Sequence, residues 1–423
     1  MKHSCLDLSC EDSLLAVRTL RNRDFRLLWT SGAISGIGSW LLVVAIPFHV
    51  FELTGSTVAT GLTLALEALP ALVIGPWAGV LLDRWNLSRA MWLADLASAG
   101  AVALILFADR ADRVWLVYVA VLAESVATTV FRPAARALLP SVVGTGDDLA
   151  AANALNAFSG SVIRLTAPPL GALLLAGPGI EFVLAVDIAS YLLSAAIIAA
   201  IRRQPSVRSA EPQRPLEGFR HAGRSKVLRG LLIGNGVFLT ANAGLTALLV
   251  PLVVDRLDAP GYAVGYLISG LGIGFLSGAA ISAKALTWLP IRDLLVVTQL
   301  ATAAAFFALV NAPTVPWAIA AAVLIGAPGS VLLITAETTI QRVSPPEMLG
   351  RIGALFFAMD SVSVITGALA AAALTTFLDL SLTLNLLAAF AVLAAPVTLF
   401  AVPSHPANLS RAKTDQTEAS DRR

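Results

Sequence analysis

The sequence has few charged residues for its length. Lys, Arg, Asp and Glu together make up 13% of the 423 residues, whereas a soluble globular domain contains about 25%. Because 57% of the residues are hydrophobic, too few polar side chains are present to cover the surface of a soluble particle of this size. The composition therefore argues against a cytosolic enzyme, a secreted protein and a disordered scaffold.

Residues that bind metals or catalyse reactions are also scarce. The chain has two Cys and four His, and the pair Cys5 and Cys10 is too small for a disulfide framework or a zinc site. It contains no G-x-x-x-x-G-K-[ST] phosphate loop, no H-E-x-x-H motif and no G-x-S-x-G elbow. We therefore expect no enzymatic activity, no metal and no cofactor. Any transport would draw on an ion gradient or run downhill, without ATP.

Long apolar runs are the abundant feature. An apolar helix of about 20 residues spans the roughly 30 Å of hydrocarbon in a bilayer, and twelve runs of about that length occur in two sets of six. They lie at residues 27–51, 57–82, 89–107, 114–131, 150–176, 182–201, 230–254, 262–283, 294–310, 315–340, 350–377 and 382–402. The sequence therefore predicts an all-α polytopic membrane protein with twelve transmembrane helices.

A polar stretch rich in Arg, Pro and Ser separates the two sets. We predict a cytoplasmic segment at 1–26, a six-helix bundle at 27–201, a cytoplasmic linker at 202–229, a second six-helix bundle at 230–402 and a cytoplasmic tail at 403–423. The basic linker is compatible with binding to lipid headgroups or with a flexible connector, and we favour the connector.

The basic residues predict the orientation. If the N-terminus is cytoplasmic, nearly all of the 29 Lys and Arg residues lie on the cytoplasmic side; Arg110, Arg113 and Arg256 lie outside, and Arg164 lies within a span. Cytoplasmic loops of membrane proteins carry such an excess of Lys and Arg. Both termini and the linker are therefore predicted to be cytoplasmic.

A short internal repeat supports duplication. Residues 128–132 read T-T-V-F-R and residues 338–342 read T-T-I-Q-R. Each copy ends the fourth span of its set and is followed by prolines. Two similar six-helix halves with a substrate site between them are a recurrent design of secondary transporters.

One cytoplasmic loop carries a family resemblance. Residues 79–89 read G-V-L-L-D-R-W-N-L-S-R, which is similar to the G-x-x-x-D-R-x-x-R-R loop of the major facilitator superfamily, although a single Arg89 stands where that family has two basic residues. The resemblance implies the major facilitator fold, with two pseudo-symmetric bundles. It also implies a gating role for Gly79, Asp83, Arg84 and Arg89, the alternative being ordinary cytoplasmic charge.

Further motifs resemble one branch of that family, the macrolide, multidrug and enterobactin-type exporters. The motifs lie before the first span, after the fourth and before the eleventh, and their inner-loop residues are Arg132, Pro133, Arg136, Gly350 and Arg351. Residues 164–171, R-L-T-A-P-P-L-G, resemble an antiporter signature, with Ala167 where Gly is usual. The resemblance implies an exporter and leaves the substrate open.

Ionisable residues inside spans are candidates for function, because each costs about 2.5–3.5 kcal/mol to insert. They are Glu67, Asp95, Glu124, Arg164, Asp187, Glu337 and Asp360. Glu67 and Asp360 fall near the midplane of their spans. Glu124 and Arg164 fall at similar depths on consecutive spans, as an ion pair that exchanges partners or as a static link. We select Glu67, Glu124, Arg164 and Asp360 as candidates for proton coupling or the substrate cavity, and interpret Asp95, Asp187 and Glu337 as mainly structural.

The functional prediction combines these features. We expect a secondary active transporter in a bacterial inner membrane, exporting hydrophobic drug-like or secondary-metabolite molecules by alternating access in exchange for protons. Its expected partners are a small-molecule substrate, protons and the lipid bilayer, without nucleic acid, and it is expected to be a monomer. The alternatives are an importer or uniporter of a small charged solute and, less favoured, a non-transporting membrane sensor.

Overall fold

The computed structural model describes residues 20–75, 77, 82, 85–144, 147–201, 222–344 and 349–402. The predicted gating residues Gly79, Asp83 and Arg84 lie outside these ranges, as do most of the predicted linker and all of the predicted tail. The side chains at 147, 150, 154, 157, 283, 287, 341 and 349–351 are likewise outside the description.

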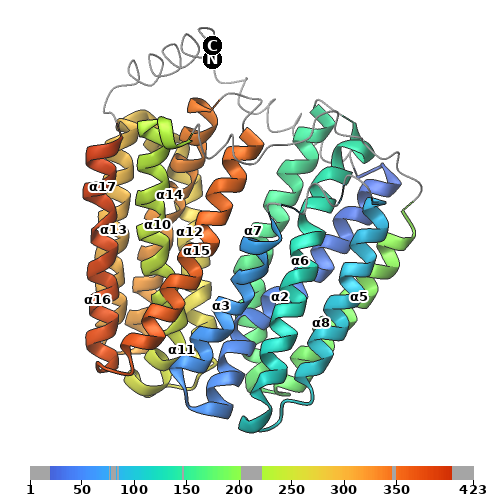
Figure 1. The fold of residues 1–423 in the computed structure, drawn as a ribbon, viewed down its shortest axis with the longest axis horizontal. Helices are drawn as coiled ribbons and strands as arrows, with labels where there is room; N and C mark the ends of the chain where they lie inside the picture. Colours follow the sequence, from blue (N-terminus) through green and yellow to red (C-terminus); the bar gives the residue numbers. More distant parts are fainter. Residues whose placement is uncertain are drawn as a thin grey trace. The chain divides into compact units, whose positions relative to one another are not determined.

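The described residues form helices and no β-strand (Figure 1). The longer helices are α2 (Arg23–Thr54), α3 (Thr57–Val73), α5 (Leu87–Ile105), α6 (Val114–Val143), α7 (Asp147–Ala176), α8 (Ile180–Ala199), α10 (Lys226–Ala247), α12 (Ala263–Trp288), α13 (Ile291–Val310), α14 (Val315–Val343), α15 (Leu349–Leu374), α16 (Leu380–Val392) and α17 (Ala394–Ala401). Three short turns complete them, namely η1 (Ala111–Arg113), α11 (Leu249–Pro251) and the π-helical η2 (Leu252–Arg256).

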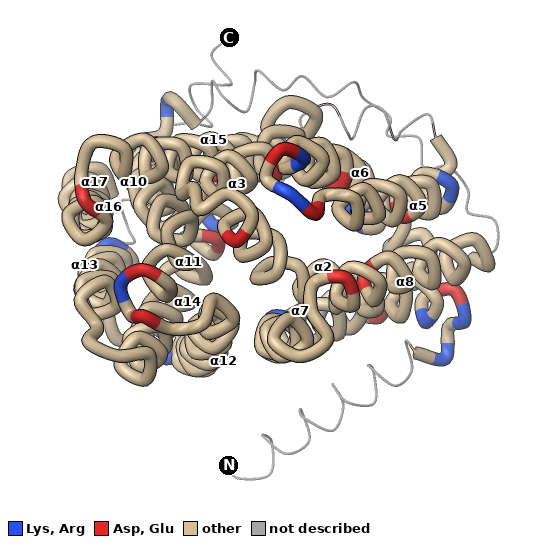
Figure 2. Tube along the Cα trace, turned by 90° about the horizontal axis from the view of Figure 1, so that it is seen from below, with Lys and Arg blue, Asp and Glu red and all other residues tan. Residues whose placement is uncertain are grey.

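The predicted polytopic all-α fold is confirmed. In the part of the chain that the structure describes, 11 helical stretches are long and apolar enough to cross a membrane, α16 and α17 counting as one stretch, Leu380–Ala401. The shorter apolar helix α3 starts the second predicted run. The helices are mostly free of charge along their length, as the tan tubes of Figure 2 show. Together these helices agree with the twelve predicted spans.

Contacts divide the chain into two units. The first contains α5, α6, α7, α8 and α2 up to His49, and the second contains α3 and the helices from α10 onward. Helix α3 joins the second unit through α15, because Thr57 Oγ1 lies 2.8 Å from Thr375 Oγ1. The predicted division into bundles at 27–201 and 230–402 stays a prediction.

In the first unit, α5 packs along both α6 and α8. Near the start of α5 an apolar cluster is fully buried, with Phe25, Met91, Leu138 and Ile198 at its centre. Asn86 caps α5 by accepting a hydrogen bond from the backbone N–H of Arg89 at 3.0 Å. Apolar burial and a capped helix end thus fix this end of the unit.

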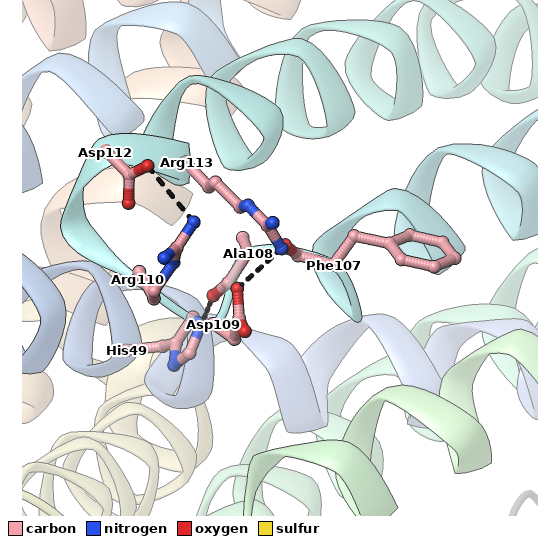
Figure 3. Close-up of polar contacts among 7 residues, drawn as sticks. All are labelled: His49, Phe107, Ala108, Asp109, Arg110, Asp112 and Arg113. Carbon is pink, nitrogen blue, oxygen red and sulfur yellow. Dashed lines mark hydrogen bonds and ion pairs between the residues drawn. The ribbon is translucent and has the colours of Figure 1, made fainter.

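The other end of α5 is held by a polar loop (Figure 3). The His49 imidazole lies 3.0 Å from the carbonyl oxygen of Ala108, so Nε2 carries the proton in this contact. Arg113 donates to Asp109 at 2.9 Å, and Arg110 lies 3.4 Å from Asp112. Because both ion pairs are exposed, the buried His49 contact contributes more to fixing α2 against this loop.

Helix α6 extends beyond its predicted span. The apolar run ends at Phe131, where a loop was expected, but the helix continues to Val143 through Pro133 and Pro140. The continuation consists largely of Ala, Leu and Arg, which favour helix. Leu138 is fully buried in the apolar cluster, so packing stabilises the extra turns despite two missing backbone donors.

Close backbone contact dominates the second unit, where α12 and α14 form its most extensive helix pair. Gly270, Gly274 and Gly278 recur every four residues on α12. A Cβ on Gly274 would lie 2.8 Å from Gly326 Cα and 2.9 Å from the backbone nitrogen of Ala327. Only a residue without a side chain fits there, and the small residues let the helices pack backbone to backbone.

Gly274→Ala is predicted to destabilise the second unit, because the added methyl group meets backbone atoms that cannot move independently. The matched control is Gly353→Ala on α15, where a Cβ meets nothing within 4 Å and Ala favours helix by about 1 kcal/mol. In detergent, the melting temperature should fall for Gly274→Ala and stay equal or rise for Gly353→Ala. Equal melting temperatures for the two variants would contradict the packing argument.

Candidate functional site

Glu124 lies in a hydrogen-bonded chain that crosses three helices of the first unit. The Tyr191 hydroxyl on α8 donates to Glu124 Oε1 on α6 at 2.7 Å. The same hydroxyl lies 2.9 Å from Ser39 Oγ on α2. Tyr191 is 5% exposed, so a buried phenol connects a predicted coupling residue to the first helix.

Arg164 stacks on an aromatic ring. Its Cζ atom on α7 lies 5.5 Å from the centroid of the Trp40 ring on α2, a cation–π distance. The Arg164 side chain is exposed, whereas Trp40 is half-buried. The Arg164 guanidinium is therefore held by the ring and still reaches the surface of the unit.

The sequence predicted Glu124 and Arg164 as a pair, and the structure links each of them to α2. Trp40 contacts Arg164 directly, whereas the preceding residue, Ser39, reaches Glu124 only through the Tyr191 hydroxyl. Direct pairing of Glu124 with Arg164 stays a prediction. The sequence pattern gave no sign that Tyr191 would connect to Glu124.

Two acids interpreted as mainly structural are the most buried of the chain's candidates in this unit. Asp187 on α8 is 0% exposed and Asp95 on α5 is 2% exposed. Ser190 Oγ donates to Asp187 Oδ1 at 3.2 Å. Within the described residues the Oδ2 atoms of both aspartates have no hydrogen-bond partner.

Helix α2 passes directly over Asp187. A Cβ built on Gly38 would overlap Asp187 Oδ1 and Ser190 Oγ. Gly38 therefore permits the close approach that puts the next residue, Ser39, beside Tyr191.

The second unit contains the predicted candidate Asp360. Asn235 Nδ2 on α10 donates to Asp360 Oδ1 on α15 at 3.2 Å, and Glu337 on α14 lies within electrostatic range of Asp360. Asp360 is half-buried. A neutral amide thus orients this carboxyl group, and Asn235 is a site residue that the sequence did not distinguish from an ordinary helix contact.

The remaining predicted residues lie at helix surfaces and ends. Glu67 is exposed on α3, and Arg89 is exposed in the first turn of α5. Arg132 and Arg136 are exposed one turn apart on α6, with half-buried Pro133 between them. Gly350 and Arg351 lie in the first turn of α15.

No group of three or more His, Cys, Asp or Glu residues with metal-site geometry occurs among the residues that the structure describes.

The chain matches a known family along most of its length. The family model described as "Transmembrane secretion effector" matches residues 15–421. Macrolide efflux protein A of Streptococcus pyogenes is 29% identical over 268 residues, which is 59% of this chain and 66%, just under two thirds, of that protein. Enterobactin exporter EntS of Escherichia coli O1:K1 / APEC is 27% identical over 352 residues, covering 81% of this chain and 83% of that protein.

Solved structures share the fold. Nucleoside transporter NupG superposes with a TM-score of 0.71 at 13% identity, over 89% of this chain and 98% of that chain. A bacterial homologue of the iron transporter ferroportin in an inward-facing state gives a TM-score of 0.68 at 13% identity, over 89% of this chain and 98% of that chain. At these identities the likeness concerns the fold alone.

The Arg164–Trp40 stack predicts non-additive substitutions. Trp40→Ala and Arg164→Ala should each lower the melting temperature in detergent, and the double variant should lower it by less than the sum. The expected coupling is about 0.5–1 kcal/mol, as for a partly exposed cation–π pair. Trp40→Phe serves as the control because it keeps an aromatic face. Strictly additive effects would show that the two side chains do not interact.

Proposed function

We propose that this chain, which belongs to the transmembrane secretion effector family of the major facilitator superfamily, exports hydrophobic drug-like or secondary-metabolite molecules in exchange for protons. Family membership makes it a multi-pass membrane transporter rather than an enzyme. The direction, the coupling ion and the substrate class are the proposed parts.

The direction rests on the curated relatives. Their names describe a macrolide efflux protein and an enterobactin exporter, and the second aligns with 81% of this chain. This is the single observation that carries the export proposal. Since the first match spans under two thirds of its relative, macrolides as substrates stay part of the proposal.

Proton coupling is supported by acids in the spans. Glu67, Glu124 and Asp360 can each bind a proton from one side and release it to the other, and Arg164 can compensate the released charge. An ion gradient supplies about 2.3 kcal/mol per charge per 100 mV of membrane potential. Glu67 is exposed on an otherwise apolar helix, and an ionised carboxylate there requires water rather than acyl chains.

The proposed setting is the inner membrane of a bacterium, with both termini cytoplasmic, because the basic residues concentrate on that side. We propose a monomer that works by alternating access. Gly79, Asp83, Arg84 and Arg89 would form the gating loop, with the Asp83 carboxylate attracted to a helix N-terminus.

An importer or uniporter of a small charged solute is the second candidate. Arg164, exposed and restrained by Trp40, suits a solute that carries an anionic or aromatic group. Structures with the same fold include a nucleoside transporter and a D-xylose-proton symporter.

Export is tested by accumulation. In a bacterial host that lacks its own drug pumps, expression should lower the steady-state accumulation of at least one hydrophobic compound, and a protonophore should restore accumulation. Uptake that expression increases would support the importer. Unchanged accumulation across a broad compound panel would overturn the export proposal.

Glu67→Gln should uncouple transport. The amide has the shape of the protonated acid and cannot release a proton, so efflux against a gradient should be lost while the variant stays folded and inserted. Glu52→Gln, at the end of α2, is the matched control and should keep wild-type efflux. Full efflux by Glu67→Gln would remove Glu67 from the proton path.

A further inference from the structure

Three helices of the first unit present polar faces to one another. On α8, Asp187, Ser190, Tyr191 and Ser194 recur at helical spacing, and all are buried. Against them, α5 contributes buried Asp95 beside Ser194, and α2 contributes half-buried Ser39 beside the Tyr191 hydroxyl. Ser39 and Ser190 donate to backbone carbonyls of their own helices, so the carboxyl groups are the costly members of this interior.

Asp95 and Asp187 are carboxyl groups whose burial is only partly compensated by hydrogen bonds. Each has an Oδ2 atom without a hydrogen-bond partner among the described residues, while Ser194 lies beside Asp95 and Ser190 donates to Asp187 Oδ1. The described residues also place no Lys, Arg or His in an ion pair with either aspartate. A buried carboxylate in this state would lack a counter-charge, and one of its two oxygens would lack a hydrogen bond.

The facing groups add negative charge. Asp187 lies within electrostatic range of Glu124 on α6 and of Asp95 on α5. The Tyr191 hydroxyl faces Glu124, and Tyr118 lies half-buried elsewhere on α6. Arg164 on α7 is stacked on Trp40 and forms no ion pair with Asp95 or Asp187 among the described residues. Three carboxyl groups therefore share a small region, and not all of them can be ionised together.

We propose that Asp95 and Asp187 bind protons in the interior of the first unit and, with Glu124, form one proton-binding site. A protonated aspartate is neutral and gains an O–H donor. Protonation of both aspartates therefore removes their buried charge. Coupling of this site to transport rests on the proposed proton exchange, whereas proton binding itself does not.

Tyr191 makes the hydrogen bonding of Ser39 on α2 depend on whether Glu124 is protonated. When Glu124 is ionised, Tyr191 donates to it and Ser39 donates to Tyr191. When Glu124 gains one proton, it donates to Tyr191, Tyr191 donates to Ser39, and Ser39 donates to the carbonyl oxygen of Ser35, 3.0 Å away. One bound proton thus reverses the chain without removing a proton from any other group.

Infrared spectroscopy of the purified protein tests the site directly. The carbonyl stretch of protonated carboxylic acids should be present at neutral pH, and Asp95→Asn and Asp187→Asn should each remove one component of it. Asp112→Asn, in the exposed outer loop, is the matched control and should leave the band unchanged. Retention of the whole carbonyl band in both variants would overturn the proposal. If one variant does not fold, retention of the band in the other variant is sufficient to overturn it.

The dependence of melting temperature on pH gives a second readout. The native state holds protons that the unfolded chain releases at neutral pH, so stability falls as the pH rises. In the double variant Asp95→Asn/Asp187→Asn, the melting temperature should no longer decrease as the pH rises. A rise in melting temperature with NaCl but not with choline chloride, abolished by Asp187→Asn, would instead identify a sodium site and overturn the proton site.

The role of Tyr191 has its own spectroscopic test. Tyr191→Phe should shift the carboxylate stretch of ionised Glu124, since the hydrogen bond from Tyr191 is lost, and should leave the two aspartate components in place. Tyr118→Phe is the control and should shift none of them. An unmoved Glu124 band would remove Tyr191 from the chain.

These measurements need neither substrate nor transport. If Asp95→Asn and Asp187→Asn remove the infrared bands but efflux by the wild-type protein is insensitive to a protonophore, the proton site stands and the proposed function is contradicted. If efflux is sensitive to a protonophore but the wild-type protein shows no such bands, the proposed function stands and the proton site is contradicted.

Discussion

The absence of water in the hydrocarbon layer determines how this chain treats its polar groups. Each polar side chain within a span has to find a partner in the protein. Most hydroxyl groups do so locally; Ser31, Thr298 and Thr302, for example, donate to backbone carbonyls one turn earlier. Against that background, polar atoms that stay unpaired are informative. Asp95 and Asp187 are such groups in the first unit, and they lie where three carboxyl groups converge.

Glycine residues have different structural roles in the two units. In the second unit, Gly274 and Gly326 let α12 and α14 pack backbone to backbone, which builds a stiff helix pair. In the first unit, Gly38 brings the backbone of α2 against Asp187 and Ser190, which places Ser39 at the Tyr191 hydroxyl. One glycine thus stabilises packing, and the other positions a hydrogen-bonded chain.

Helix α2 connects an acid and a cation that were both predicted as functional residues, Glu124 and Arg164. Ser39 continues the chain from Glu124, and Trp40 holds the Arg164 guanidinium. A change in proton occupancy at Glu124 alters the hydrogen bonding of Ser39, and the adjacent Trp40 contacts the cation. The proposed coupling between a proton and a charged or aromatic substrate group would have a short physical route here, along one turn of helix.

Hydropathy along the chain was sufficient to predict the membrane fold, because a spanning helix depends on its own residues and the lipid around it. The acids within spans were equally readable, and the polar face of α8 at Asp187, Ser190, Tyr191 and Ser194 could have been found from helical spacing. Partners could not be found in this way. Whether Glu124 meets Tyr191, and whether Asp187 Oδ2 stays without a partner, depends on how α2, α5, α6 and α8 rotate against one another. That rotation is decided by contacts such as Gly38 against Asp187, between residues far apart in sequence, and only the packed tertiary structure determines them.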